Sequence, residues 1–352
     1  MKRIITCSDG TWNKPGATDR GIVVQTNVEK MFNCICNTGK SLDGAEDIKQ
    51  LKAYDNGVGT GYSKWDQISG GITGLGIDKH IKDMYTFICL NYKPGDELYL
   101  FGFSRGAYTA RSLSGFIRNC GLLRPTHLYL VDKAYDIYRD RNTYSSPDSD
   151  MMKAWRANYC IEDITPIYFI GVWDTVGALG IPLPSYKKLN EAKYKFHDYT
   201  LSSYVRYAYH ALAIDEKRAL FTPTLWEKSD TVMRDENHPQ VMEQRWFAGV
   251  HSNIGGGYAD SGLSDIALHW LMQKAGGAGL CYHEPPVIPI SPKALAELRN
   301  SYTSRYWFWR PKWRLINTAD EKSNQTIDDS VWQRYDADEK YRPKNLEGIK
   351  RQ

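Results

Sequence analysis

Residues 97–110 read Glu-Leu-Tyr-Leu-Phe-Gly-Phe-Ser-Arg-Gly-Ala-Tyr-Thr-Ala and place a serine where it would be a nucleophile. An apolar run leads into Gly-x-Ser-x-Gly, with Gly102 and Gly106 two residues on either side of Ser104, and a helical pattern follows. Small residues at these positions let the chain turn sharply from strand to helix and expose the serine hydroxyl at a sheet edge. The pattern predicts a nucleophile elbow; the alternative is a glycine-rich turn that holds a serine by chance.

A nucleophilic serine needs a general base, normally a histidine that a carboxylate orients. His251 follows the apolar run 245–250, so we expect it on a loop at the carboxyl end of a strand. His210 and His269 fall in segments that we predict to be helical. The remaining histidines after Ser104 lie in polar segments without a preceding buried strand: His127, His197, His238 and His283. His251 is therefore the predicted base.

The acid is expected at the end of another strand between the serine and the histidine. Asp174 ends the apolar run 166–173, which would deliver its carboxylate to the sheet edge. The competing carboxylates are Asp198, Asp215 and, outside the serine, acid, histidine order, Asp9 and Asp260. An alternative role for Asp174 is the N-cap of the segment that follows it.

Backbone N–H groups are the expected donors to an oxyanion. Arg105 opens the helix after Ser104, and Gly10 and Thr11 follow the first predicted strand, where the equivalent loop completes the oxyanion hole in this type of fold. The glycine-rich segments 57–60 and 255–257 lack the spacing of a phosphate-binding loop. A nucleotide site is therefore disfavoured.

Strands and helices alternate along the chain that positions these residues. Short apolar runs predict strands at 3–7, 50–54, 97–103, 167–173 and 245–250. Residues 77–88 and 108–117 repeat apolar side chains with helical spacing, and helices are also predicted at 201–214 and at 264–274, the latter with Ser264 as N-cap. The alternation predicts an α/β-hydrolase-like fold, a mostly parallel central sheet with helices on both faces. The polar segments 121–165 and 175–200 are expected insertions above the carboxyl edge.

The chain divides at about residue 285. We expect a catalytic domain over 1–284 and an aromatic, basic appendage over 285–352 that packs on the same domain. Within it, residues 306–314 alternate Trp, Phe and Tyr with Lys and Arg. These aromatic rings would either pack on the core or lie in a membrane interface, where indole rings and basic side chains favour the headgroup level.

Composition and charge exclude several classes of protein. The 352 residues carry a net charge of +4, which is too dilute for a nucleic-acid partner. We expect no signal peptide and no membrane span, because apolar stretches of about 18 residues are missing. The seven cysteines are scattered without metal-ligand spacing, so we expect reduced core thiols, no metal and no other cofactor in a protein made in the cytoplasm.

Seven blocks together resemble an α/β-hydrolase family that includes phospholipase effectors of bacterial type VI secretion. They are residues 7–13, 57–60, 102–107, 172–182, 213–218, 250–258 and 341–346. The resemblance implies a catalytic triad at Ser104, Asp174 and His251, the residues that the sequence pattern also selects. It further implies lipid ester substrates, delivery by a secretion system, and a secretion-system or immunity protein as partner.

We therefore expect a serine hydrolase that cleaves an ester, with a lipid or phospholipid ester as the favoured substrate. One alternative is a carboxylesterase, amidase or thioesterase that acts on a small acyl substrate. A non-catalytic interaction protein that retains the fold is the other.

Overall fold

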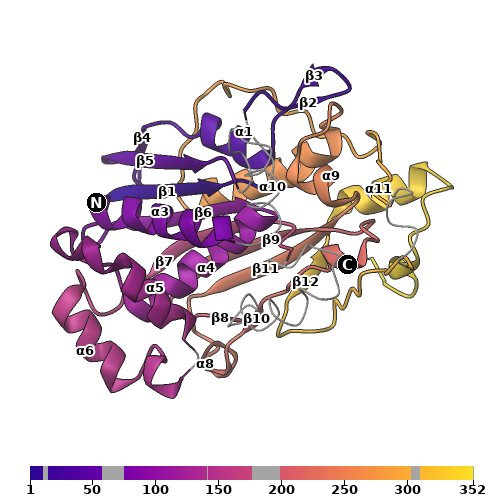
Figure 1. Ribbon diagram of the computed structural model, residues 1–352. Helices are drawn as coiled ribbons and strands as arrows, with labels where there is room; N and C mark the ends of the chain where they lie inside the picture. The colour runs from indigo at the N-terminus through magenta and orange to yellow at the C-terminus, as the bar shows by residue number, and fades with distance from the viewer. Residues whose placement is uncertain (11–14, 58–74, 141, 177–198, 303–309, 352) are drawn as a thin grey trace.

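The computed structural model describes residues 1–10, 15–57, 75–140, 142–176, 199–302 and 310–351. Within them, an eight-stranded sheet forms the centre of the molecule (Figure 1) in the order β12-β11-β9-β7-β6-β1-β5-β4. Neighbouring strands run parallel except β4, which pairs antiparallel with β5. The strands are β1 (Lys2–Ser8), β4 (Thr38–Lys40), β5 (Asp47–Asp55), β6 (Glu97–Phe103), β7 (Ile167–Trp173), β9 (Val205–Ala213), β11 (Val241–Phe247) and β12 (Gln325–Ile327). This confirms the predicted α/β-hydrolase-like architecture.

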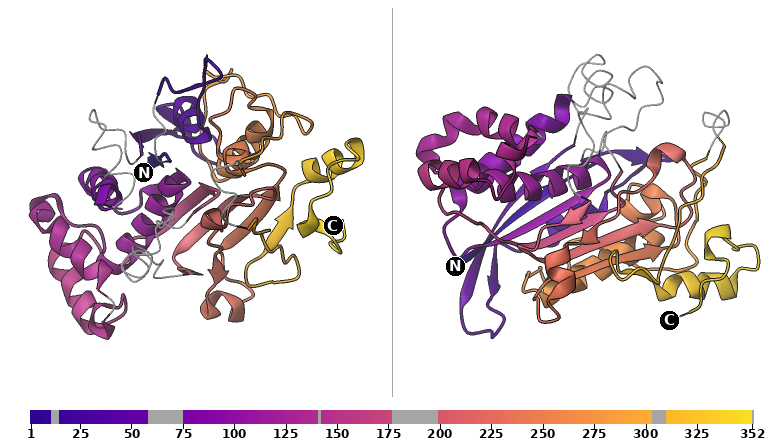
Figure 2. Two further views of the ribbon diagram at one scale, coloured as in Figure 1. Left: turned by 45° about the vertical axis from the view of Figure 1, so that its right-hand side comes forward. Right: turned by 90° about the horizontal axis from the view of Figure 1, so that it is seen from below.

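Helices cover both faces of the sheet, as the right-hand view of Figure 2 shows. One face packs against α3 (Leu75–Asn91), α4 (Arg105–Cys120), α5 (Val131–Arg139) and α6 (Asp150–Tyr159). The other packs against α1 (Asn27–Cys34), α9 (His251–Gly255) and α10 (Gly262–Gly277). Successive side chains of β6 alternate between these two cores, Leu98 and Leu100 toward one and Tyr99 and Phe101 toward the other. The alternation is the geometry of a strand that is buried on both faces.

Short elements complete the described chain. Two two-stranded sheets pair β2 (Thr18–Asp19) with β3 (Ile22–Val23) and β8 (Thr200–Leu201) with β10 (Glu227–Lys228). The segment 121–165 consists mainly of helices. It connects the end of α4 to the start of β7, and α5 and α6 share a core with α3 and α4 on one face of the sheet, so its expected place above the carboxyl edge is wrong. Most of the expected insertion at 175–200 lies outside the described residues. The remaining short helices are η1 (Pro125–Leu130), η2 (Thr143–Ser145), η3 (Ala219–Phe221), α8 (Asp230–Arg234) and η5 (Lys344–Leu346).

The helix predicted at 201–214 is wrong, because this segment forms β8 and then β9 in the middle of the sheet. From Ala208 to Ala213 every residue of β9 is buried, so polar and apolar positions do not alternate. A strand covered on both faces reads as a continuous apolar run, which periodicity does not separate from a buried helix. His210 is therefore a strand residue, not a helical one.

Two further boundaries differ from the predictions. Strand β11 begins at Val241 and ends at Phe247, where the sequence suggested 245–250. Helix α10 begins at Gly262 after the N-cap residue Ser261, so Ser264 is not the N-cap; its hydroxyl donates to the Ser261 carbonyl at 2.9 Å. The strands at 97–103 and 167–173 have the predicted bounds.

The C-terminal segment joins the sheet edge next to β11. Strand β12 pairs with β11, and α11 (Asp329–Ala337) follows it (Figure 2, yellow). A third apolar core lies here, with Leu212 and Trp246 from the sheet and Ile316, Val331 and Tyr341 from the C-terminal segment. Residues after 310 thus share a core with the central strands.

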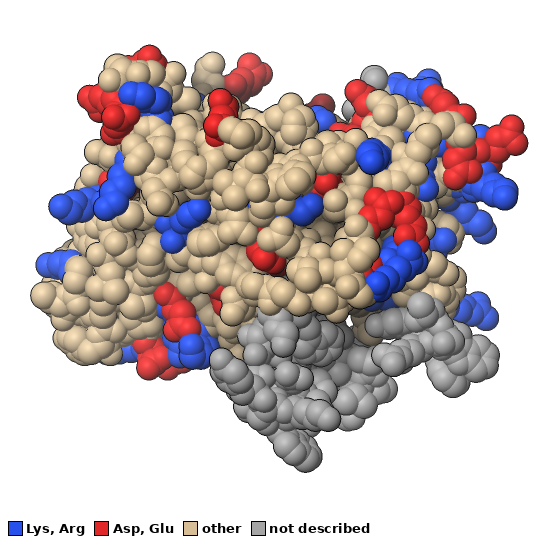
Figure 3. All heavy atoms as spheres, turned by 90° about the horizontal axis from the view of Figure 1, so that it is seen from above, with Lys and Arg blue, Asp and Glu red and all other residues tan. Residues whose placement is uncertain are grey.

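The surface mixes charges of both signs. On the face in Figure 3, Lys and Arg are interspersed with Asp and Glu. Among the described helices, none is both long and apolar enough to cross a bilayer. All seven cysteines are free; five are buried, and Cys36 and Cys281 are partly exposed.

Candidate active site

Ser104 occupies the turn between β6 and α4, at the carboxyl end of the sheet. Its backbone has φ 58° and ψ −118°, a conformation that is costly for a residue with a side chain and is typical of nucleophile elbows. A Cβ on Gly102 would lie 2.2 Å from the carbonyl oxygen of Gly106, so glycine is required at the first flank of the turn. The chain thus turns sharply from β6 into α4 at Ser104, with Gly102 and Gly106 on either side.

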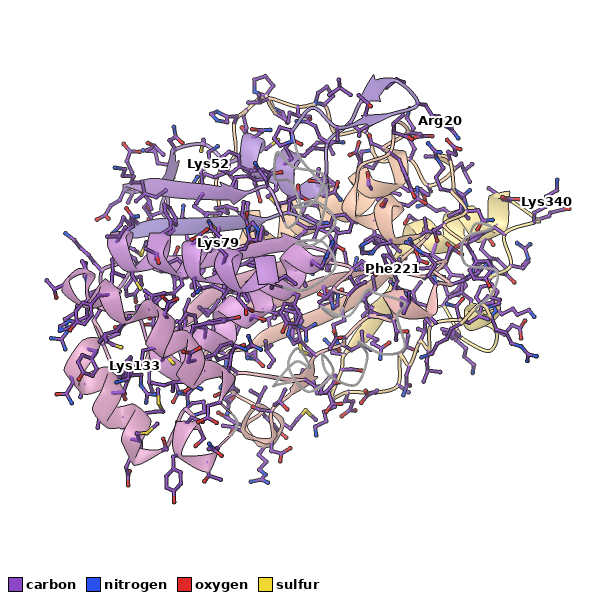
Figure 4. All side chains as sticks on the ribbon, viewed as in Figure 1. Arg20, Lys52, Lys79, Lys133, Phe221 and Lys340 are labelled. Carbon is purple, nitrogen blue, oxygen red and sulfur yellow. The ribbon has the colours of Figure 1, made fainter. Side chains whose placement is uncertain are left out.

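His251 faces this serine from the next-but-two strand of the sheet. It is the first residue of the short helix α9 after β11, where the sequence predicted a loop. Its Nε2 lies 2.8 Å from the Ser104 hydroxyl oxygen. The rings of Phe103 and Phe221 flank the imidazole, with centroids 4.7 and 4.9 Å away; Figure 4 marks Phe221 at this end of the sheet. Contacts on two sides fix the plane of the imidazole ring.

Asp174 contacts the other ring nitrogen of His251, so that Ser104, His251 and Asp174 form a row. It follows β7 with φ 40° and is fully buried. Its Oδ2 lies 2.5 Å from His251 Nδ1, and its Oδ1 accepts from the Ala213 N–H at 3.0 Å. Most of the segment that Asp174 would cap in its alternative role lies outside the described residues. The carboxylate selects the imidazole tautomer that leaves Nε2 free to accept a proton.

The competing carboxylates within the described residues are engaged elsewhere. Asp9 accepts from Thr26, Tyr54 and Gly10. Asp260 accepts from the backbone N–H groups of Gly262 and Glu297. Asp215 accepts from Gly249 and Tyr341. Asp198 and His197 lie outside the described residues.

Asp215 has an unusual protonation equilibrium. Burial raises its pKa to about 6, although hydrogen bonds from the Gly249 N–H at 2.8 Å and the Tyr341 hydroxyl at 3.0 Å favour the charged form. It lies two residues after the Ala213 amide that holds Asp174. Through these two hydrogen bonds, the Asp215 carboxyl group links Tyr341 of the C-terminal segment to the loop that contains Gly249, after β11.

Sequence reasoning missed Arg314, a residue of the C-terminal segment that contacts the predicted acid Asp174. Its Nη1 lies 2.5 Å from Asp174 Oδ1 and its Nη2 lies 3.0 Å from Oδ2. Burial by itself would raise the pKa of Asp174, but the Arg314 charge and the hydrogen bond from His251 outweigh it and hold the pKa well below its usual range. The carboxylate is thus kept ionised. A lone arginine 140 positions away from its partner gives no local sequence signal.

Glu216 was also missed. Its Oε2 accepts from the His251 backbone N–H at 3.2 Å, and both of its oxygens accept from the Ser301 hydroxyl at 3.0 Å. Arg218 forms an ion pair with the same carboxylate at 2.8 Å and stacks on Phe221. Burial opposes its ionisation, but Arg218 lowers the pKa of Glu216. The sequence signal that could have pointed to Glu216 was the charged block 213–218. The family resemblance includes this block, but no residue in it was given a role.

The predicted oxyanion donors differ in their surroundings. Arg105 is the first residue of α4, and the backbone N–H groups in the first turn of a helix point toward its N-terminus. Gly10, in contrast, donates its N–H to Asp9 Oδ1 at 2.6 Å. Thr11 lies outside the described residues. Arg105 is therefore the candidate donor whose position fits directly.

The other glycine-rich segments pack around the site. A Cβ on Gly57 would lie 2.1 Å from the Gly10 carbonyl oxygen, and one on Gly255 would lie 2.0 Å from the Phe103 ring. Gly256 has φ 87° and packs against the backbone of Thr26 and Asn27. Close packing thus accounts for glycine at positions 57, 255 and 256, whereas a Cβ on Gly257 would meet nothing within 4 Å and residues 58–60 lie outside the described residues.

Part of the aromatic, basic segment is described. Residues 303–309 lie outside the described residues. Beyond them, Trp313 is partly buried with the Lys217 ammonium 4.3 Å from its ring centroid, and Arg314 is buried. The described end of the segment thus packs on the protein.

Comparison with known proteins gives a family. Residues 2–274 match the model of the catalytic domain of Tle1-like phospholipase effectors of the type VI secretion system (T6SS). An uncharacterised protein of Saccharomyces cerevisiae is 27% identical over 238 residues, 62% of this chain and 32% of that protein.

Two solved structures are similar at 18% identity. A crystal structure of an uncharacterised protein from Pseudomonas aeruginosa covers 83% of this chain and 49% of its own, with a TM-score of 0.46. The structure of the Tle1 effector bound to the VgrG spike of the type VI secretion system covers 74% and 52%, with a TM-score of 0.36. This chain spans about a third of the yeast protein and about half of each solved chain. On the match over residues 2–274, the chain belongs to the family of Tle1-like T6SS phospholipase effector catalytic domains.

Proposed function

We propose that this protein hydrolyses a lipid ester through an acyl-enzyme on Ser104. Membership of a phospholipase effector family supports hydrolysis of a lipid ester. The single observation that carries the mechanism is the continuous chain of contacts from Asp174 through His251 to the Ser104 hydroxyl, at 2.5 and 2.8 Å. Such a row lets a neutral imidazole take the hydroxyl proton as the oxygen attacks a carbonyl carbon.

In the first half of the reaction, Ser104 Oγ bonds to the ester carbonyl carbon while His251 Nε2 takes the hydroxyl proton. The negative charge on the carbonyl oxygen would be met by the Arg105 N–H and by a second N–H from Gly10 or Thr11. Gly10 would first have to break its hydrogen bond to Asp9. The alcohol then leaves with the proton from His251.

In the second half, water attacks the acyl-enzyme and His251 again accepts a proton. The acid leaves, and Ser104 regains its hydrogen. Asp174 stays ionised throughout and stabilises the imidazolium. The products are one carboxylic acid and one alcohol.

Ser104→Ala tests the proposal. We expect hydrolysis of a chromogenic short-chain ester and of phospholipid vesicles to fall by about 10⁴ to 10⁶ with an unchanged melting temperature. A fluorophosphonate should label the wild-type protein at Ser104 and leave the variant unlabelled. Full activity of a folded Ser104→Ala protein would disprove the mechanism. Cleavage of small esters with intact phospholipids would point to a carboxylesterase or thioesterase instead.

Family membership supports a second proposal, that the protein is an effector delivered by a type VI secretion system. Its partners would then be a secretion-system carrier in the producing cell and an immunity protein that blocks its activity. Co-purification of the tagged full chain from its own cells, with and without a functional secretion system, tests this. Capture of secretion-system components is expected, and their absence would contradict delivery.

A further inference from the structure

We propose that Arg314 is a positioning residue of the triad: its guanidinium balances the charge of the Asp174 carboxylate and holds it in the orientation that meets His251 Nδ1. This inference rests on the proposed function. It also places a working part of the site outside residues 2–274, the range that the family model matches.

The geometry is that of a two-pronged arginine–carboxylate pair. Each terminal nitrogen of Arg314 contacts a different oxygen of Asp174, at 2.5 and 3.0 Å. Arg314 is 5% exposed and Asp174 is 0% exposed, so water does not screen the pair. A paired, planar contact of this kind fixes the rotation of the carboxylate as well as its position.

Arg314 is itself held at two further points. Nη1 donates to the Ala213 carbonyl at 2.8 Å, and Nη2 donates to the Phe221 carbonyl at 2.6 Å. The Ala213 amide donates to Asp174 Oδ1, and the Phe221 ring packs on the His251 imidazole. One guanidinium therefore joins the acid, the strand beside it and the ring that orients the base.

The charges of Arg314 and Asp174 affect how readily His251 can act as a base. Asp174 without a partner would favour the imidazolium, which cannot act as a base. The Arg314 cation opposes that effect, while its contact keeps Asp174 itself ionised. Among the described residues, other charged or titratable groups near the row are Glu216 with Arg218 beside α9 and His210 on β9 beside Asp174, and Arg105 follows Ser104 at the start of α4.

His210 adds no charge in this balance. Burial and the nearby Arg111 lower its pKa to about 3, so it is neutral at ordinary pH. Glu216 and Arg218 form their own ion pair. Arg314 is thus the cation in direct contact with the Asp174 carboxylate in the described part of the chain.

Arg334 offers a matched control in the same C-terminal segment. It is 7% exposed, comparable with Arg314, and its Nη1 donates to the carbonyls of Ala294 and Ala296 at 2.9 and 2.8 Å. It stacks on Tyr341 and does not contact the triad. Its substitution removes a buried arginine without touching Asp174.

The test compares Arg314→Gln, Arg314→Lys, Arg334→Gln and Ser104→Ala in the full chain. For Arg314→Gln we expect kcat on a soluble ester to fall about 10²-fold with KM little changed. The acid limb of the pH–rate profile should move up by roughly one pH unit, because loss of a nearby cation eases protonation of the base. Arg314→Lys should recover part of kcat and of the shift, and Arg334→Gln should leave the limb in place.

A second readout does not need turnover. The proton between His251 Nδ1 and Asp174 should give a far-downfield proton NMR signal that Arg314→Gln displaces or broadens and Arg334→Gln retains. An unshifted pH profile and an unchanged signal in a folded Arg314→Gln protein would overturn the proposal, as would equal effects of Arg334→Gln. If Arg314→Gln does not fold, Arg314→Lys decides by the same two readouts. If the Ser104→Ala variant keeps the activity of the wild type, the proposed function is refuted. The NMR signal then still decides whether Arg314 positions Asp174.

Discussion

Gly106 lies directly against the carbonyl oxygen of Ser8, where a Cβ would come within 2.0 Å of that oxygen. Strand β1 and the start of α4 are therefore as close as their backbones permit. The contact places the loop after β1 beside the nucleophile, where an oxyanion donor would be needed. Because no side chain fits between these two backbones, a substitution of Gly106 tests the predicted elbow directly.

Gly106→Ala should abolish esterase activity and lower the free energy of unfolding by several kcal/mol, since the added methyl meets backbone atoms that cannot rotate away. Thermal unfolding and ester turnover measure the two effects. Gly277→Ala in α10 is the matched control, because its Cβ would meet nothing within 4 Å. An active, stable Gly106→Ala protein would contradict the elbow geometry.

The triad variants should not be additive. His251→Ala is expected to lower kcat as much as Ser104→Ala, and the double variant should be no worse than either. Kinetics on a soluble ester provide the comparison. Losses that multiply would show that the two side chains do not act as one catalytic unit.

Asp174→Asn should slow turnover by about 10⁴, because an amide favours the wrong histidine tautomer. It should also lower the melting temperature, since the buried Arg314 would lose its countercharge, a change that costs about 3–5 kcal/mol at comparable sites. Calorimetry at pH 7 measures this cost. Asp260→Asn should leave turnover unchanged; if it instead stops catalysis, the acid has been misassigned.

The pKa of Asp215, raised to about 6, predicts a stability that falls as pH rises. An unfolded-state aspartate releases its proton near pH ~3.9, whereas the folded one keeps it to about pH 6, so raising the pH through this window favours unfolding. Asp215→Asn should lack this pH dependence and gain stability relative to the wild type as the pH rises from 4 to 6, by about 3 kcal/mol. Denaturant unfolding across this range gives the measurement.

Asp260→Asn serves as the opposite case. Backbone N–H groups of Glu297 and Gly262 lower the pKa of Asp260, so its contribution to stability is present above pH ~4 and is lost as pH falls. The variant should therefore be less stable than the wild type at pH 7, with the difference shrinking in acid. Parallel pH trends for the two variants would refute the assignment of Asp215.

For the aromatic, basic segment 306–314, the sequence leaves two alternatives, packing on the core and contact with a membrane interface, which vesicle binding separates. Trp307→Ala combined with Trp309→Ala should reduce sedimentation with anionic vesicles while soluble-ester activity is kept. Trp332→Ala, in α11, provides a control at a described tryptophan. Unchanged vesicle binding would remove the interfacial hypothesis, and loss of folding would place these rings in the core.

The sequence predicted the candidate site residues that directly follow an apolar strand. Ser104, Asp174 and His251 each follow an apolar strand, so parallel strands were enough to predict that they meet at one edge. Arg314 and Glu216 could not be found in this way, because each is defined by a partner far along the chain. Strand β9 was misread for another reason: burial on both faces removes the alternation that marks a strand.

The two edges of the sheet are β4 and β12, and each is only three residues long in the described structure. Exposed edge strands offer unpaired backbone groups to other molecules, and short edges limit how many such bonds can form. Lys40 at the end of β4 adds a charge that a second sheet would have to bury beside its own backbone. These short edges thereby limit edge-to-edge aggregation at high local concentration.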